Sequence, residues 1–336
     1  MRNLKSLIIF SLVVGLFACQ PTENTDVNLV QKVPATYEDL VGFFREWRSF
    51  ENPPLRDGAP DYTAQTFEQR YAVFKELQNK LLAMDIESWP VPHQVDWHIV
   101  RAEMNGYDFN HRILQPWARD PAFYKSLWMD RSDVPAHEGP THHATTEFWT
   151  YKFPLSEESR RKLLGELGII PALNSQAKIN LTGNAKDLWI AGIRDIKTQV
   201  SDLENIKKRD GIAGDNALEQ VIDEAIASTN DLAEWLTAQS PDKTGPSGIG
   251  KDNYTWYQQN VHLVPLTWED EVMLLKREIA RAWSALKLEE HRNRKLPELK
   301  PADSPEAYDR MAEASARSLM RFLEEEDIVT VADYFD

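Results

Sequence analysis

The sequence predicts a mostly α-helical protein, a multi-helix bundle with few or no strands. Apolar residues recur at steps of three and four along most of the chain, which is the helical period. Helix-start signals precede several of these runs, and the only short β-like run late in the chain is Val329–Val331. The 336 residues are 42% hydrophobic and include 11 Trp, so the chain can bury a core and is not a disordered one.

Four helices are expected in the first half. The first three span Tyr37–Phe50, Thr66–Met84 and Val95–Leu114, where apolar residues follow the helical period and prolines lie between the runs. The fourth begins at Ser156, which precedes two acidic residues, and continues toward Ile170.

The second half predicts four more helices. The first has Asn184 as its expected N-cap, and the third has Thr267. The apolar face of the first is Trp189, Ile193, Ile196, Val200 and Leu203, and that of the second is Leu218, Val221, Ala225, Leu232 and Leu236. The apolar face of the third is Trp268, Val272, Leu275, Ile279, Ala282 and Leu286. The fourth helix starts at Ser304-Pro305, and its face is Tyr308, Met311, Ser315 and Phe322. We expect the longest irregular stretches at Arg119–Thr141 and Ser240–Asp252.

The N-terminus has the pattern of a secretion signal. A basic start precedes an uncharged run, Leu7–Ala18, that is too short to span a bilayer and is typical of a secretory signal peptide. The run ends in LFAC, which resembles the bacterial lipobox and implies an acylated Cys19. We therefore expect residues 1–18 to be a signal peptide, 19–35 the lipidated Cys and a flexible tether, and 36–336 one helical domain. The alternative is a plain cleaved signal peptide with Cys19 as an incidental thiol.

The residue after Cys19 indicates a location, and the net charge limits the possible partners. Gln20 follows the Cys where Asp would signal inner-membrane retention, so the expected location is the cell envelope, at the outer membrane facing the periplasm. The formal net charge of −15 argues against nucleic acid as a partner, because a phosphate backbone needs a basic footprint. An acidic body is also repelled by anionic lipid, so the acyl chain would be the attachment to the membrane.

Gly245–Lys251 has the spacing of a phosphate-binding loop. No strand precedes it, and Asp252 stands where a Ser or Thr should hold magnesium. We therefore interpret it as a glycine-rich loop over which backbone can pass closely rather than a nucleotide site.

A histidine-rich stretch is the weak metal candidate. Its candidate ligands are His137, His142, His143 and Glu147. The first two histidines are five apart, with Gly139-Pro140 between them, whereas a zincin helix needs histidines four apart. We expect a polar loop and no metal or other cofactor held by this chain.

The helix over Val95–Leu114 carries a polar stripe at steps of three and four. Its members are His98, Arg101, Asn105, Asp108 and Arg112. Either the stripe is a solvated salt-bridge face, or it forms one polar wall of a cleft. No serine elbow is present, and acylation uses the single Cys, so we assign no catalytic residue.

Several motifs resemble a bacterial family called domain of unknown function 885. They are SGIGKDNYTWY over Ser247–Tyr257, NVHLVPLTWE over Asn260–Glu269, WPVPHQVDW over Trp89–Trp97, RAEMN over Arg101–Asn105 and NLTGNAKDLW over Asn180–Trp189. The resemblance covers nearly the whole chain after the tether. It implies the N-terminal part of a helical, zincin-like peptidase fold whose zinc helix lies in a second half, and nothing here matches that helix.

Two functions follow as hypotheses. The first is the helical half of a peptidase-like envelope lipoprotein, in which a peptide cleft would be walled by His98, Arg101, Asn105 and Asp108 on one side and by Gly248, Gly250, Tyr254 and Trp256 on the other. Zinc would come from longer relatives' second half, so this chain alone should not hydrolyse peptides. The alternative is a complete, non-catalytic helical binding lipoprotein. An exposed apolar surface would favour the first hypothesis, and a closed, polar-surfaced bundle the second.

Overall fold

The structure is a computed structural model that describes residues 31–131, 143–298, 300–330 and 332. It divides into two compact units, one up to Glu269 and one from Asp270 onward. The expected signal peptide and the expected lipidation at Cys19 lie outside the described residues.

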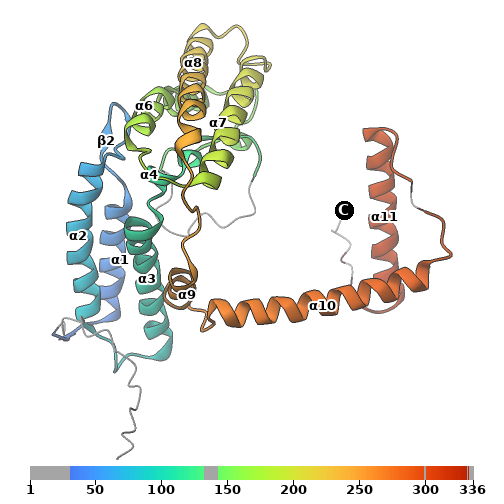
Figure 1. Cartoon of the computed structure of the whole chain (residues 1–336), viewed down its shortest axis with the longest axis horizontal. Coiled ribbons are helices and arrows are strands. Elements are labelled where there is room, and N and C mark those ends of the chain that lie inside the picture. The colour runs from blue at the N-terminus through green and yellow to red at the C-terminus, as the bar shows by residue number, and fades with distance from the viewer. Residues whose placement is uncertain (1–30, 132–142, 299, 331, 333–336) are drawn as a thin grey trace, which may run out of the picture. The chain divides into compact units, whose positions relative to one another are not determined.

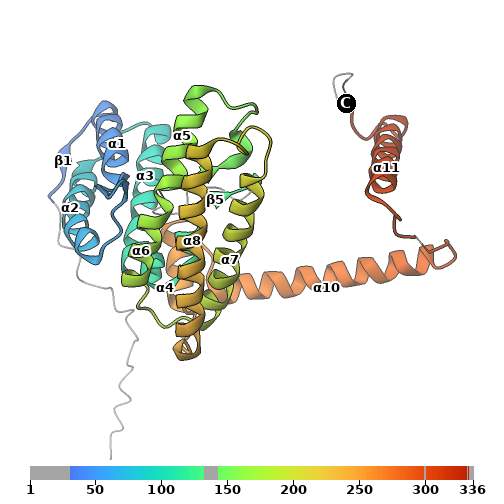
Figure 2. The same ribbon diagram turned by 90° about the horizontal axis from the view of Figure 1, so that it is seen from above.

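The first unit is built mainly of α-helices (Figures 1 and 2). Its α-helices are α1 (Tyr37–Glu51), α2 (Ala64–Ala83), α3 (Val91–Phe109), α4 (Pro116–Arg119), α5 (Glu157–Gly168), α6 (Ile170–Asn180), α7 (Lys186–Lys207), α8 (Asn216–Gln239) and α9 (Lys251–Asn260). Short 3-10 turns lie at η2 (Pro121–Tyr124), η3 (Phe148–Thr150) and η4 (Ser240–Asp242). The predicted helical class is confirmed.

Strands are confined to pairs of two residues each in the described part of the chain. β1 (Val33–Pro34) pairs in parallel with β4 (Met84–Asp85), β2 (Leu55–Arg56) antiparallel with β3 (Ala59–Pro60), and β5 (Leu127–Trp128) in parallel with β6 (Thr146–Glu147). These pairs fasten chain segments between helices and do not form a layer. Val329 and Thr330, expected to be β-like, are not in a strand.

Helices α1, α2 and α3 share one core. Trp47 and Phe74 are fully buried in it, and their rings lie 6.0 Å apart. Trp47 also meets the edge of the Tyr107 ring at 5.4 Å. The whole cluster draws on all three helices, which is why each of them needs an apolar stripe.

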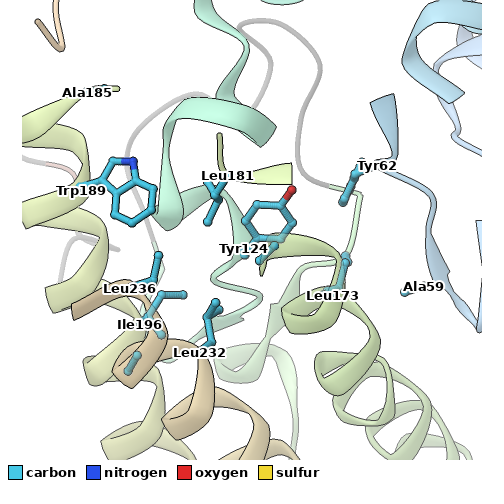
Figure 3. Packing of buried hydrophobic residues seen from close by; sticks show 13 residues of the cluster. Ala59, Tyr62, Tyr124, Leu173, Leu181, Ala185, Trp189, Ile196, Leu232 and Leu236 are labelled. Carbon is cyan, nitrogen blue, oxygen red and sulfur yellow. The ribbon is translucent and has the colours of Figure 1, made fainter. Parts of the chain in front are cut away.

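Helices α6, α7 and α8 form the second core with the η2 turn. Figure 3 shows Tyr124, Leu181, Trp189, Ile196 and Leu232 converging there. Trp189, Ile196 and Leu232 have no exposed surface. A third cluster continues along α5, α7 and α8, so buried apolar residues follow the α7–α8 pair from Trp189 to Ile206 and from Leu218 to Leu236.

Local signals fixed several helix starts. The side chains of Ser156, Asp215 and Ser304 each accept a hydrogen bond from a backbone N–H of the first turn that follows. The predicted N-cap role of Asn184 is wrong, because the N-cap of α7 is Ala185 and the Asn184 side chain accepts from the Gly245 N–H at 2.6 Å. The helix expected up to Leu114 changes to a π-helical turn, η1 (Asn110–Leu114).

The expected loops are partly regular. Arg119 ends α4, and η2 and β5 follow it, so only part of the stretch from Arg119 to Thr141 is irregular; residues 132–142 lie outside the described part. The second expected loop begins with the η4 turn.

The second unit carries most of α10 (Trp268–Asn293), whose first two residues belong to the first unit, and α11 (Pro305–Glu325). Neither helix contains a buried residue. None of the described helices combines the length and apolar composition that a membrane crossing requires.

Candidate functional site

The two walls predicted for a cleft lie against each other. The Asn105 side chain on α3 donates to the backbone carbonyl of Asn260 at the end of α9, at 3.0 Å. The buried Phe109 stacks on Trp256 at 5.6 Å and meets Tyr257 edge-on at 4.8 Å. The structure therefore brings α3 and α9 together as a packed interface.

Asp108 is held inside the first unit. It is 7% exposed and accepts the Tyr71 hydroxyl of α2 at 2.7 Å and the Arg112 guanidinium Nε at 2.8 Å. Desolvation, followed by the hydrogen bond to Asp108, raises the pKa of the Tyr71 phenol well above its usual range. Because both carboxylate oxygens are engaged, Asp108 ties α2 to the end of α3.

His98 and Arg101 lie at the other end of the stripe and are exposed. Both contact the Trp97 ring: the His98 ring lies edge-on at 5.0 Å, and the Arg101 guanidinium is 5.7 Å from its centroid. The five-residue stripe is thus divided: His98 and Arg101 are exposed, Asn105 and Asp108 are packed, and Arg112 is exposed but paired with Asp108.

The glycine-rich loop caps a helix. The Ser247 hydroxyl accepts from the backbone N–H groups of Asp187 and Leu188, at 2.8 and 3.3 Å, at the start of α7. The Lys186 N–H donates to the Gly245 carbonyl at 3.0 Å, and the Arg119 guanidinium donates to the Ser247 carbonyl at 3.1 Å. These contacts use several of the loop's polar groups within the protein itself.

The glycine that permits close approach is Gly245. A Cβ there would lie 2.5 Å from the Asn184 carbonyl oxygen, whereas one at Gly248 or Gly250 would meet nothing within 4 Å. Gly250 instead has φ +81° as the N-cap of α9, a backbone conformation that favours glycine. Of the predicted pair, Gly250 therefore leads the chain into α9, and neither Gly248 nor Gly250 lies against a neighbouring backbone.

Tyr254 and Trp256, the remaining residues of the predicted cleft, are half-buried on α9. The Tyr254 hydroxyl accepts from the Gln258 side chain at 3.0 Å. The Arg112 guanidinium lies 5.9 Å from the Trp256 ring centroid, so Arg112 links Asp108 to α9.

Two of the metal candidates, His143 and Glu147, are described, and His137 and His142 lie outside the described residues. The His143 backbone N–H donates to the Tyr62 hydroxyl at 2.8 Å. The residue is exposed overall but lines a small cavity with Arg70, and desolvation there, followed by the Arg70 charge, lowers the pKa of the imidazole. In the described ranges no three His, Cys, Asp or Glu side chains gather as metal ligands would.

The sequence did not reveal that Asp108 has a hydrogen-bond partner on another helix. Tyr71, which bonds Asp108, stacks on His111 at 3.9 Å, and the His111 ring is carried by the π-helical turn η1. The spacing of Asp108 and Arg112 signals their own pairing, but no local pattern connects Tyr71, 37 residues away, to them.

Comparisons with known proteins add little to this geometry. No protein-family model matches the chain, and no curated protein matches it. A solved structure described as "a putative lipoprotein of unknown function" from Shewanella oneidensis is similar, with a TM-score of 0.49 and 15% identity. The alignment covers 89% of this chain but only 59% of that one.

Proposed function

We propose that this chain is a lipid-anchored cell-envelope protein that supplies the helical half of a peptidase-like domain and holds no metal of its own. The observation that carries the proposal is the pair of uncovered apolar faces on α10 and α11. The resemblance of the Ser247–Tyr257 and Asn260–Glu269 motifs to the peptidase-like family supports the kind of domain.

The face of α10 is regular and long. Ile279 and Trp283 are each 57% exposed, on a helix that contains no buried residue. Leu275 and Leu286 are exposed on the same side of the helix, and Met273 and Leu288 are exposed on other sides. A helix that carries such a stripe normally packs it against another element, because apolar area in water costs about 25 cal/mol per Å².

The face of α11 has the same character. Its exposed large apolar residues are Tyr308, Met311, Leu319 and Phe322. They recur at helical spacing, so they lie on one side of the helix, and the charged residues Arg310, Glu313 and Arg317 lie on the opposite side. Isolated exposed apolar residues are ordinary, whereas a repeated face indicates an interaction surface.

The partner that we propose for both faces is further polypeptide of the same domain, which would also bring the zinc ligands. In that assembly the α3–α9 interface would form the supporting wall of a peptide cleft, with exposed His98 and Arg101 at its edge. Peptides are accordingly the proposed ligand class, and the acyl chain on Cys19 the proposed membrane attachment.

The reading frame after the codon for Asp336 tests the proposal. We expect a polypeptide with a His/Glu metal helix, and we expect that polypeptide to co-purify with the chain from Gln20 when the two are co-expressed. Ile279→Glu and Met311→Glu should abolish co-purification, whereas the matched surface change Glu313→Gln should not. A stop codon at that point would contradict the proposal and favour the complete binding lipoprotein. So would co-purification that is unchanged in both Ile279→Glu and Met311→Glu.

The anchor is tested separately. Cys19→Ser should move the protein from the membrane fraction to the soluble periplasm or leave it uncleaved, because the thiol that accepts the lipid is lost. Failure of the wild type to incorporate labelled fatty acid would show that the lipoprotein assignment is wrong.

A further inference from the structure

A groove between α1 and α3 lies on the side of α3 away from the predicted cleft residues. Its volume is about 360 Å³, within the range of small-molecule sites. The floor and walls are apolar: Leu40, Val41, Phe44, Ile99 and Val100. Ile99 is 52% exposed, so the groove is open to solvent along this side.

One end of the groove is formed by side chains that are ion-paired with one another. The Glu103 carboxylate contacts the Arg48 guanidinium at 2.8 Å and accepts from the Trp47 indole N–H at 2.9 Å. Arg48 also contacts Glu51 at 2.8 Å. The charged side chains at this end are therefore already engaged in ion pairs with one another.

The opposite end has a carboxylate without a cation. Asp96 accepts the Tyr37 hydroxyl at 2.7 Å, and no ion pair to Asp96 occurs among the described residues. One aromatic ring, that of Tyr37, lines this end; behind the groove it stacks on His93 at 3.9 Å and meets the Trp89 ring edge-on at 6.4 Å. A carboxylate beside an aromatic ring is a surrounding that recognises organic cations.

The carboxylates at the two ends lie on the same side of one helix, α3. Asp96 and Glu103 are seven residues apart on α3, which corresponds to about 10 Å of helical rise, with Ile99 and Val100 between them. The groove is therefore a short apolar channel with a carboxylate that has no ion pair at one end and the Glu103–Arg48 ion pair at the other. Its volume suits a small molecule better than a helix about 10 Å wide.

We propose that this groove binds a small amphiphilic cation. The ammonium head lies at Asp96 beside Tyr37, and the apolar tail runs along Phe44 and Ile99 toward the Glu103–Arg48 pair. An anionic amphiphile of the same length would place like charge against Asp96, and a neutral one would leave the carboxylate without a cation. This site is independent of the proposed peptidase-like function.

Calorimetric titration of the chain from Gln20 with octyltrimethylammonium, below its micelle concentration, tests the site. We expect saturable binding that is weakened about fivefold by Asp96→Asn, the loss typical of one exposed charge pair. Ile99→Asn, which shortens the apolar wall, should also weaken it. Glu38→Gln, an exposed carboxylate on the first turn of α1 that does not line the groove, should leave binding unchanged.

Octanoate and octanol serve as the anionic and neutral probes, and circular dichroism verifies that each variant folds. Selective binding of the cation, lost in Asp96→Asn, supports the proposal. Absence of binding, equal binding of octanol or octanoate, or an unchanged affinity in folded Asp96→Asn would overturn it.

Discussion

Helices α7 and α10 have the same apolar period but opposite surroundings. In α7 the residues Trp189, Ile196 and Leu203 have no exposed surface. In α10 the residues Ile279 and Trp283 are each more than half exposed. Periodicity determines that a helix has an apolar side, whereas burial depends on whether another element reaches it, as α8 reaches α7.

The difference extends to polar groups. The first unit uses buried or half-buried polar side chains to join distant segments, as Tyr71 and Asp108 join α2 to α3. In α11, by contrast, the ion pair between Arg317 and Glu313 joins residues of neighbouring turns, at 3.0 Å. Stability is therefore expected to be concentrated in the first unit.

The largest expected contrast is between two tryptophans. Trp189→Ala should lower the free energy of unfolding by about 3–5 kcal/mol, because it leaves a cavity in the α6–α7–α8 core. Trp283→Ala should change it by no more than about 0.5 kcal/mol. Urea denaturation of both variants checks this, and a comparable loss for Trp283→Ala would show that the α10 face is covered within the chain.

A second contrast compares carboxylates. Asp108→Asn should cost about 1–3 kcal/mol, because it weakens the bonds to Tyr71 and Arg112 at a nearly buried position. Glu313→Gln on α11 should have almost no effect, since its pair with Arg317 is exposed. Denaturation midpoints measure both, and equal effects would remove the distinction between the two units.

The smallest contrast concerns helix caps. Asp215→Ala should cost about 1 kcal/mol of global stability through the α8 cap, while Ser304→Ala should reduce only local α11 helicity. The hydrogen bond from Arg160, followed by those from the Leu218 and Ala217 N–H groups, lowers the Asp215 pKa to about 2. The lowered pKa implies stability that is present above the unfolded value near 3.9 and is lost as pH falls toward 2.

Denaturation between pH 5 and 2 checks the sign of this effect. The wild type should lose part of its stability over that interval, and Asp215→Ala should lose less of it. An identical acid dependence in the two proteins would be inconsistent with the ion pair to Arg160.

Helix positions and caps followed from the sequence because they depend on neighbours within one turn. Ser156 and Ser304 cap as expected, and the 4-3 steps locate α7, α8 and α10. The role of Asn184 could not be predicted, since it depends on Gly245 arriving from a loop 61 residues away. The contact of α3 with α9 and the open groove of α3 at Asp96 likewise require the tertiary arrangement.

Amide hydrogen exchange of the chain from Gln20, taken alone, tests the central claim that α10 and α11 await a covering polypeptide. We expect amides in α7 and α8 to be protected up to the global stability and those in α10 and α11 to exchange far faster, near the limit for frayed helices. Equal protection of the two pairs in the monomeric chain would contradict the account, because the apolar faces of α10 and α11 would then already be covered.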